Sequence, residues 1–185
     1  MATFDVVIPT SKNIEETHFS ICYTLRSILA QSIQPQNIYV VENVPNTGVK
    51  EHINRSFGNL VKVIDGLNKP INIAYARNLG AKMSQSDILV FMDDDVIIGR
   101  NDFCQKVIEI MKYNDFCCGA KRFWTTTEWH KYLSLSFQMN HNLQILKSKS
   151  FLPQSIERST GNKNCSEFTY IGNFGAIKKD VFNSL

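Results

Sequence analysis

Three consecutive carboxylates, Asp93, Asp94 and Asp95, are the residues of this chain with the clearest capacity for chemistry, and they directly follow the apolar run 88–92. Carboxylates this close together repel one another and raise each other's pKa. A divalent cation relieves that repulsion, and hard oxygen ligands favour Mg²⁺ or Mn²⁺. Because Mg²⁺ usually takes one or two protein carboxylates and completes its shell with phosphate oxygens, the predicted partner is a nucleotide diphosphate. The plainer alternative is a solvated acidic turn or a helix N-terminus.

The elements that would position these residues alternate along the chain. Apolar strands are predicted at 4–10, 38–41, 60–64 and 87–92, and helical patterns at 19–29, 49–57, 74–83 and 101–113. This alternation favours a mainly parallel α/β sheet, in which ligands bind at the carboxyl ends of the strands. Besides the three aspartates, the residues expected there are Pro9, Thr10, Glu42 and Asn43.

The pattern weakens after about residue 125. A further strand is predicted within 116–124, and another at 168–177 with a helix beginning at residue 178. The stretch 125–166 reads as a long loop or a lid. No internal repeat is present.

Composition excludes several classes of protein. Hydrophobic residues make up 43% of the 185 residues and charged residues 20%, which is typical of a globular chain and excludes wholesale disorder. No apolar run approaches the roughly 18 residues of a membrane span, and the first residues lack the pattern of a signal peptide. The five cysteines show no C-x-x-C spacing, which speaks against a zinc site and favours reduced thiols in the cytoplasm.

The net charge of +3 is too small to predict nucleic-acid binding. Its distribution is uneven, since residues 1–120 carry a net −2 and residues 121–185 a net +5. The basic part is either a solvated face or lies near an anionic acceptor or a membrane surface.

Five motifs occur in a characteristic order. They are Val-Val-Ile-Pro-Thr at 6–10, Leu-Arg-Ser-Ile-Leu-Ala-Gln at 25–31, Asn-Ile-Ala-Tyr-Ala-Arg-Asn-Leu-Gly at 72–80, Phe-Met-Asp-Asp-Asp at 91–95, and the Gly-x-x-x-Ala element from Gly172 to Phe182. Each is weak alone, but together and in this order the chain resembles the family 2 glycosyltransferases, inverting enzymes with the GT-A fold.

The resemblance implies a single GT-A-like domain over 1–185, with a nucleotide-sugar-binding part at 1–124 and an acceptor-side part at 125–185 that is incomplete at its C-terminus. It implies transfer of a sugar, from a UDP-sugar by preference, to a hydroxyl of a saccharide or lipid-linked acceptor, with inversion and with Mn²⁺ or Mg²⁺. A cytoplasmic enzyme of polysaccharide or glycolipid synthesis, in peripheral contact with the inner face of the membrane, is the expected setting.

On the donor side, the resemblance implies that Pro9 and Thr10 border the nucleotide base. Glu42 stands where the family usually has an aspartate that bonds the base or the ribose. Arg77 would lie near the diphosphate, whose oxygens suit a guanidinium fork.

In the acidic segment, the resemblance implies that Asp93 binds the ribose and Asp95 the metal. Asp94 lies between them and is expected either on the nucleotide-sugar or on the metal. Gly172 and Asn173 belong to the acceptor-side motif, where Asn173 would touch sugar hydroxyls.

Two departures from the family pattern bear on function. The family commonly has Val-Asp-Asp-x-Ser where this chain has Val41-Glu42-Asn43, which leaves the choice of nucleotide open. The general base of the family usually lies beyond the Gly172–Phe182 element, so it is expected beyond Leu185. The chain's remaining candidates, Glu128, Glu157 and Glu167, have no motif behind them.

Two alternatives follow. One is a truncated or degenerate glycosyltransferase-like domain that binds nucleotide without turnover, which a missing base would favour. The other is a sugar nucleotidyltransferase, which would need a glycine-rich phosphate loop near the N-terminus. No glycine occurs between Val6 and Glu15, which counts against it.

Overall fold

The computed structural model of the chain describes residues 2–11, 14–45, 47–64, 70–98, 100–118 and 174–184, with the side chains of 14–20 and 118 left aside. These residues belong to one compact unit built from 1–117 and 172–185, and a second unit, 118–171, lies almost wholly outside them. The predicted loop at 125–166 falls in that second unit.

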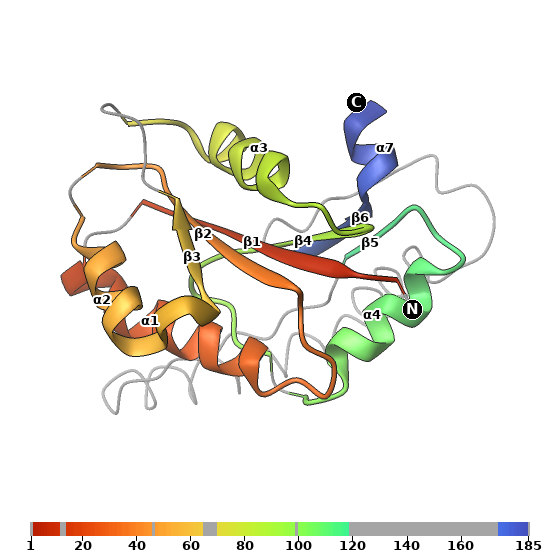
Figure 1. The fold of residues 1–185 in the computed structure, drawn as a ribbon, viewed down its shortest axis with the longest axis horizontal. Helices are drawn as coiled ribbons and strands as arrows, with labels where there is room; N and C mark the ends of the chain where they lie inside the picture. Colours follow the sequence, from red (N-terminus) through yellow and green to blue (C-terminus); the bar gives the residue numbers. More distant parts are fainter. Residues whose placement is uncertain are drawn as a thin grey trace, which may run out of the picture. The chain divides into compact units, whose positions relative to one another are not determined.

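A six-stranded sheet forms the centre of the described unit (Figure 1). Its order is β3-β2-β1-β4-β6-β5. The strands are β1 (Phe4–Thr10), β2 (Asn37–Glu42), β3 (Lys62–Ile64), β4 (Ile88–Met92), β5 (Phe116–Cys118) and β6 (Phe174–Lys178). β1 pairs in parallel with β2 and β4, and β2 pairs in parallel with β3. β6 runs antiparallel to β4. Since the other three described pairings are parallel, the sheet is mainly parallel, as predicted.

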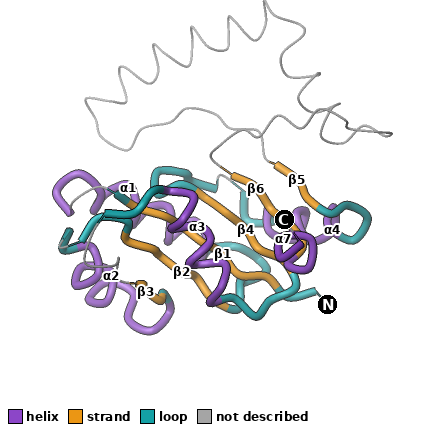
Figure 2. The backbone as a smooth tube through the Cα atoms, turned by 90° about the horizontal axis from the view of Figure 1, so that it is seen from above, coloured by secondary structure: helices purple, strands orange, loops and turns teal. Residues whose placement is uncertain are grey.

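Helices cover both faces of this sheet, as Figures 1 and 2 show. They are α1 (Ile14–Leu29), α2 (Val49–Phe57), α3 (Ile73–Met83), α4 (Phe103–Met111) and α7 (Lys179–Ser184). The first, second and fourth contribute to one core layer, while α3 and α7 contribute to the layer on the opposite face. The predicted α/β architecture is therefore confirmed.

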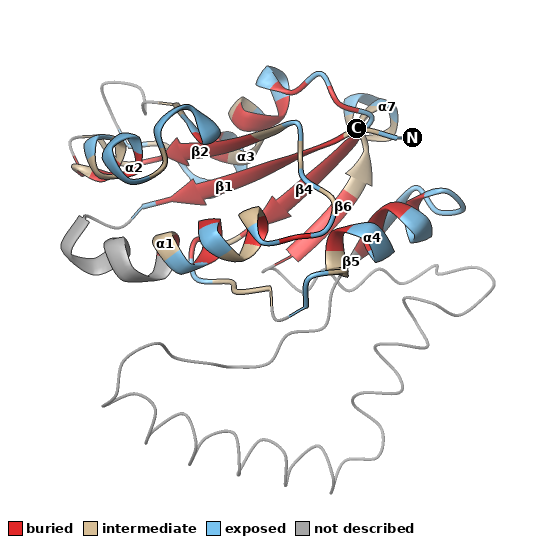
Figure 3. Ribbon diagram, turned by 60° about the horizontal axis from the view of Figure 1, so that its bottom comes forward, coloured by how far each residue is buried: buried red, intermediate tan, exposed pale blue. Residues whose placement is uncertain are grey.

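The two core layers follow from the alternation of side chains along each strand. In β4, Val90 and Met92 lie in the layer with α1 and α4, whereas Leu89 and Phe91 lie in the layer with α3. All seven residues of β1 are buried, which explains why its sequence is apolar almost throughout (Figure 3). The same alternation continues into the residues that follow the strands and determines which helix each of them meets.

A glycine brings α3 close to the sheet. A Cβ atom on Gly80 would lie 2.4 Å from Cγ1 of Val7 and 3.1 Å from Cγ2 of Val41. Its neighbours on the sheet-facing side, Ala76 and Ala81, are small and fully buried. The small residues in this helix therefore allow close packing on β1 and β2.

Most element bounds agree with the prediction to within two residues. The predicted strand at 60–64 begins only at Lys62, because Gly58–Leu60 forms a short 3-10 turn after α2. Of the strands predicted at 116–124 and 168–177, the described portions are Phe116–Cys118 and Phe174–Lys178.

Candidate functional site

The carboxyl ends of β1, β2 and β4 meet at one edge of the sheet. Thr10, the last residue of β1, pairs with Glu42, the last residue of β2. The amide of Asn43 donates to the carbonyl of Thr10 at 2.9 Å. Because β4 runs parallel to β1, Asp93 leaves the sheet at the same edge. The structure thus places at one edge the residues that the sequence assigns to the strand ends.

Asp93 points toward α3. Its Oδ1 lies 3.0 Å from a terminal nitrogen of Arg77, and the two side chains retain 25% and 19% exposure. The helix begins one turn before Arg77, where the side chain of Asn72 accepts from the amide of Tyr75 at 2.8 Å. Burial raises the pKa of Asp93 above its ordinary value, Arg77 opposes this, and the neighbouring carboxylates of Asp95 and Asp94 raise it further.

Asp94 points the opposite way, into the layer that contains α1. It is 7% exposed, and the hydroxyl of Thr10 donates to its Oδ2 at 2.7 Å. The hydroxyl of Thr24, on α1, donates to its backbone carbonyl at 3.1 Å. Asp94 therefore ties the end of β1 and the helix α1 to the acidic segment. Asp95, the third residue of that segment, is exposed.

Two further side chains hold the chain after the acidic segment, Ser27 on α1 and Gln31 two residues beyond the end of that helix. The amide of Ile98 donates to the hydroxyl oxygen of Ser27 at 3.0 Å. Gln31 donates from Nε2 to the carbonyl of Arg100 at 2.7 Å, and its Oε1 accepts from the amide of Cys104 at 3.1 Å. Sequence reasoning quotes 25–31 as a motif but assigns these side chains no role. For Ser27 the available signal was its spacing from Thr24, because residues three apart share one helix face.

Glu42 faces α2. Its Oε1 accepts from the hydroxyl of Thr47 at 2.8 Å and from the amide of Lys50, in the first turn of α2, at 2.9 Å. The residue before this helix is Gly48, with φ of 75°, which offers no side-chain cap. A carboxylate near a helix N-terminus is favoured by the helix dipole. The predicted contact of Glu42 with base or ribose stays a prediction.

Asn43 holds a buried polar atom beside these residues. Its carbonyl accepts from the amide of Ile71 at 2.8 Å, which connects β2 to the segment before α3. Its side-chain Oδ1 is buried and has no hydrogen-bond partner within the part of the chain that the structure describes. Buried polar atoms are normally satisfied, by protein, water or ligand, so this oxygen is a further candidate for a ligand contact.

The remaining predicted residues divide into two groups. Pro9 is buried near the end of β1, opposite Val41. Gly172 and Asn173 lie outside the described residues, as do Glu128, Glu157 and Glu167. The acceptor side and the general base therefore stay predictions.

The acidic segment suits a cation that shares its shell with phosphate. Within the described ranges, no group of three or more His, Cys, Asp or Glu side chains could hold a metal by itself. Asp93 and Asp95 supply two carboxylates, which fits the mode in which Mg²⁺ or Mn²⁺ takes one or two protein ligands and completes its shell with phosphate oxygens. Mutual repulsion within the segment also favours a bound cation.

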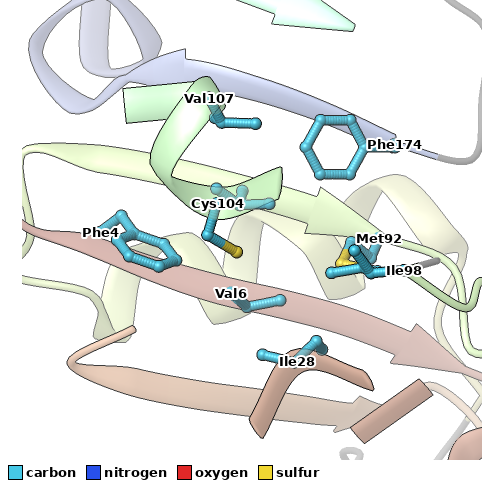
Figure 4. Close-up of a pocket in the computed structure, with 9 residues that line it drawn as sticks. Phe4, Val6, Ile28, Met92, Ile98, Cys104, Val107 and Phe174 are labelled. Carbon is cyan, nitrogen blue, oxygen red and sulfur yellow. The ribbon is translucent and has the colours of Figure 1, made fainter. Parts of the chain in front are cut away.

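A cavity elsewhere in the unit carries no chemistry. It lies between the sheet and the helices α1 and α4, and its walls are apolar (Figure 4). Its volume, about 10 Å³, is at the lower limit for one water molecule. It is a packing gap in the core. Separately, none of the described helices is long and apolar enough to cross a membrane.

Comparisons with known proteins agree with this geometry. Among solved structures, the chain is similar to the mannosyltransferase PcManGT from Pyrobaculum calidifontis in complex with GDP-Man and Mn²⁺, with a TM-score of 0.67 and 14% identity, over 99% of this chain and 46% of that one. It is also similar to S. aureus TarS 1–349, with a TM-score of 0.53 and 17% identity, over 68% of this chain and 38% of that one. TarS 1–349 in complex with UDP-GlcNAc matches with a TM-score of 0.51 at 17% identity, over 68% of this chain and 37% of that one. At this identity the likeness shows the fold alone, and it confirms the GT-A-like α/β architecture.

The chain spans less than half the length of these structures. No curated protein matches it. The sequence family is nevertheless shown, because residues 5–185 match the family described as glycosyl transferase family 2. With the ordered motifs, the GT-A-like sheet and the acidic strand end, we conclude that this chain belongs to glycosyl transferase family 2.

Proposed function

We propose that this chain is the donor-binding part of a glycosyltransferase that moves a sugar from a nucleotide-sugar to an acceptor hydroxyl. The observation that carries the proposal is the position of Asp93 and Asp95 at the carboxyl edge of the sheet, with Arg77 at 3.0 Å from Asp93. Membership of glycosyl transferase family 2 supports it.

In this proposal, Asp95 holds Mn²⁺ or Mg²⁺ together with the diphosphate of the donor, and Asp93 binds the ribose. The chemistry that a bound cation supplies there is neutralisation of negative charge on the departing nucleoside diphosphate. Arg77 contributes a second positive charge on the α3 side, where its guanidinium can serve both Asp93 and a phosphate oxygen. Pro9, Thr10 and Asn43 border the nucleoside.

The transfer proceeds with inversion. The acceptor oxygen forms a bond to the anomeric carbon as the bond from that carbon to the diphosphate oxygen breaks. The electron pair of the broken bond stays on the diphosphate, and the hydroxyl proton passes to a general base. We place that base outside the described residues, on the acceptor side.

For the donor, the proposal names a UDP-sugar first. The related structures support nucleotide-sugars as a class, since PcManGT is in complex with GDP-Man and TarS with UDP-GlcNAc. We propose a saccharide or lipid-linked acceptor, reached by peripheral contact with the inner face of the membrane. The net charge of +5 over residues 121–185 supports an anionic surface nearby.

The test is thermal unfolding with UDP, GDP and CDP, each with Mn²⁺ and with EDTA, on the wild type and on Asp95→Ala. A ligand at 100 times its Kd adds roughly 2.7 kcal/mol to the stability of the folded state. We expect one nucleotide to stabilise the wild type only with Mn²⁺, and this effect to be lost in Asp95→Ala. Glu109→Ala, which removes an exposed carboxylate on α4, is the matched control and should respond like the wild type.

No stabilisation of the wild type by any nucleotide with Mn²⁺ would overturn the proposal. Nucleotide binding without release of nucleoside diphosphate, in the presence of donor and acceptor, would favour a binding module. Formation of a nucleotide-sugar from a sugar phosphate would instead identify a nucleotidyltransferase.

A further inference from the structure

We propose that Asp94 and three side chains, on α1 or just beyond its C-terminal end, are positioning residues that set the geometry of Asp93 and Asp95. The three are Thr24, Ser27 and Gln31, and we call them the α1 clamp. The inference deepens the proposed function and rests on it: the clamp would determine how well the acidic segment binds a divalent cation with a nucleoside diphosphate.

The side chain of Asp94 turns inward. Its carboxylate accepts from Thr10 at 2.7 Å and is almost fully buried, so it faces the interior beside α1. Its neighbour Asp93 faces Arg77 on the other side of the sheet. Asp94 therefore does not share the side of the sheet on which Asp93 lies, and its role is to anchor the segment from within.

The peptide unit between Asp94 and Asp95 is also held in place. The carbonyl of Asp94 belongs to the peptide unit that leads into Asp95, and Thr24 donates to that carbonyl at 3.1 Å. The amide of Val96 donates back to the carbonyl of Asp93, which closes a turn around the two residues between them. A peptide unit held on its carbonyl by a buried hydroxyl has little freedom to rotate. The direction of the Asp95 side chain therefore depends on Thr24.

Further hydrogen bonds hold the chain that follows the acidic segment. Ser27 holds Ile98, and Gln31 holds Arg100 and Cys104. α1 itself is fixed to the sheet by three fully buried apolar residues, Ile21, Leu25 and Ile28. α1 thus presents apolar side chains to the core, and α1 together with the turn after it presents polar side chains to the segment 94–104. Burying a hydroxyl or amide group without a hydrogen bond costs free energy, so these hydrogen bonds stabilise the arrangement.

The burial of Thr24 makes the inference testable. Its side chain is 0% exposed, so it cannot touch a ligand. Any change in cation or nucleotide binding on substitution of Thr24 must pass through the residues that it contacts. Groups that orient metal ligands from the next layer typically change metal affinity by about 10- to 100-fold when they are removed.

The experiment measures Mn²⁺ affinity by calorimetric titration in the presence of UDP, and again of GDP, for the wild type, Thr24→Val and Thr24→Ser. We expect Thr24→Val to weaken Mn²⁺ binding by about 10- to 100-fold and Thr24→Ser, which keeps the hydroxyl, to stay near the wild type. All titrations are made well below the melting temperature of each variant.

The control is Ser84→Ala. The hydroxyl of Ser84 donates to the buried carboxylate of Asp5 at 2.7 Å, the same distance and chemistry as Thr10 and Asp94, but near the start of β1. This variant should lose stability and keep wild-type Mn²⁺ affinity, which separates positioning from general destabilisation. Should Thr24→Val not fold, Ser27→Ala is measured in its place against the same control.

Wild-type Mn²⁺ affinity in the folded Thr24→Val or Ser27→Ala variant would overturn the inference and leave the proposed function intact. A wild-type chain that binds no Mn²⁺ with either nucleotide would overturn the proposed function, and the inference with it.

Discussion

Arg77 and Asp93 join the helix α3 to the end of β4 through a nitrogen–oxygen distance of 3.0 Å. They lie 16 residues apart in sequence. The pair forms because two local rules agree. Alternation along β4 directs Asp93 to the α3 side, and the close approach of α3 at Gly80 brings that helix within reach. Each partner is thus positioned by the element that carries it.

We expect Arg77→Met to lower the free energy of unfolding by about 1.5 kcal/mol, the lower end for a hydrogen bond to a charged group, because both side chains remain partly exposed. The same change removes a positive charge from the diphosphate side, so it should also weaken Mn²⁺-dependent nucleotide binding. Arg77→Lys keeps the charge and loses the planar fork, so its affinity should be intermediate. Urea unfolding and nucleotide titration check both effects, and unchanged affinity in Arg77→Met would remove Arg77 from the donor site.

The raised pKa of Asp93 predicts a pH dependence with a definite sign. Burial is the main cause of the shift, so the folded chain keeps a proton at this carboxyl where the unfolded chain has already lost it. The contribution of Asp93 to stability is therefore greatest below the ordinary value of 3.8 and falls as pH rises through the folded pKa.

Asp93→Asn stays neutral and should not show this fall. As pH rises from about 4 to about 7, the unfolding free energy of the variant, measured in urea, should therefore increase relative to that of the wild type. Binding of Mn²⁺ with nucleotide needs the carboxylate, so in the wild type it should strengthen over the same range. A constant difference in stability between the two proteins across this range would contradict the assignment.

Glu42 caps α2, so its substitution should first affect stability. Glu42→Gln keeps an acceptor for Thr47 and Lys50 but loses the charge at the helix N-terminus, for a cost of about 0.5 kcal/mol. Glu42→Asp should cost more, about 1 kcal/mol, because its shorter side chain cannot reach both donors. Glu51→Gln, an exposed acid in the first turn of the same helix, is the control. A Glu42→Asp variant with full stability would show that the cap is dispensable.

Gly80→Ala should destabilise the fold by about 1–3 kcal/mol, because the new Cβ would overlap the stiff side chain of Val7 and push α3 outward. Since α3 carries Arg77, nucleotide affinity should fall as well. In the double variant with Val7→Ala, the space is restored, so the cost of adding the methyl group should be smaller than in the wild-type background. Strict additivity in chemical denaturation would argue against the overlap.

Much of the fold could be predicted from the sequence because burial is so complete. β1 is buried on both faces and its sequence is mainly apolar, and the spacing at 49–57 matches α2 at both ends. The late start of β3 was missed, since Gly58–Leu60 forms a turn through its backbone rather than through a distinctive side-chain pattern.

The residues of the site could be predicted from the sequence, but the side of the sheet that each side chain faces could not. The sequence identifies Asp93, Asp94 and Asp95 as a group, yet only the packing of β4 shows that the first two face opposite sides. The side of the sheet that Glu42 faces could have been predicted, because side chains two residues apart on a strand share a face and Val40 belongs to the layer with α1 and α2. The hydroxyl of Thr24 could not, since its acceptor lies 70 residues further along the chain.

The insertion of β6 between β4 and β5 has a consequence for how this chain is made. One edge of β4 pairs with β1, but the other edge finds its partner only when the segment from Phe174 to Lys178 has been synthesised. Until then, the nascent chain presents the apolar edge of β4 with its backbone groups unpaired, which is the kind of edge that recruits other strands. Such late, non-local pairing slows folding. We therefore expect that covering this edge of β4 during synthesis would protect the chain from aggregation.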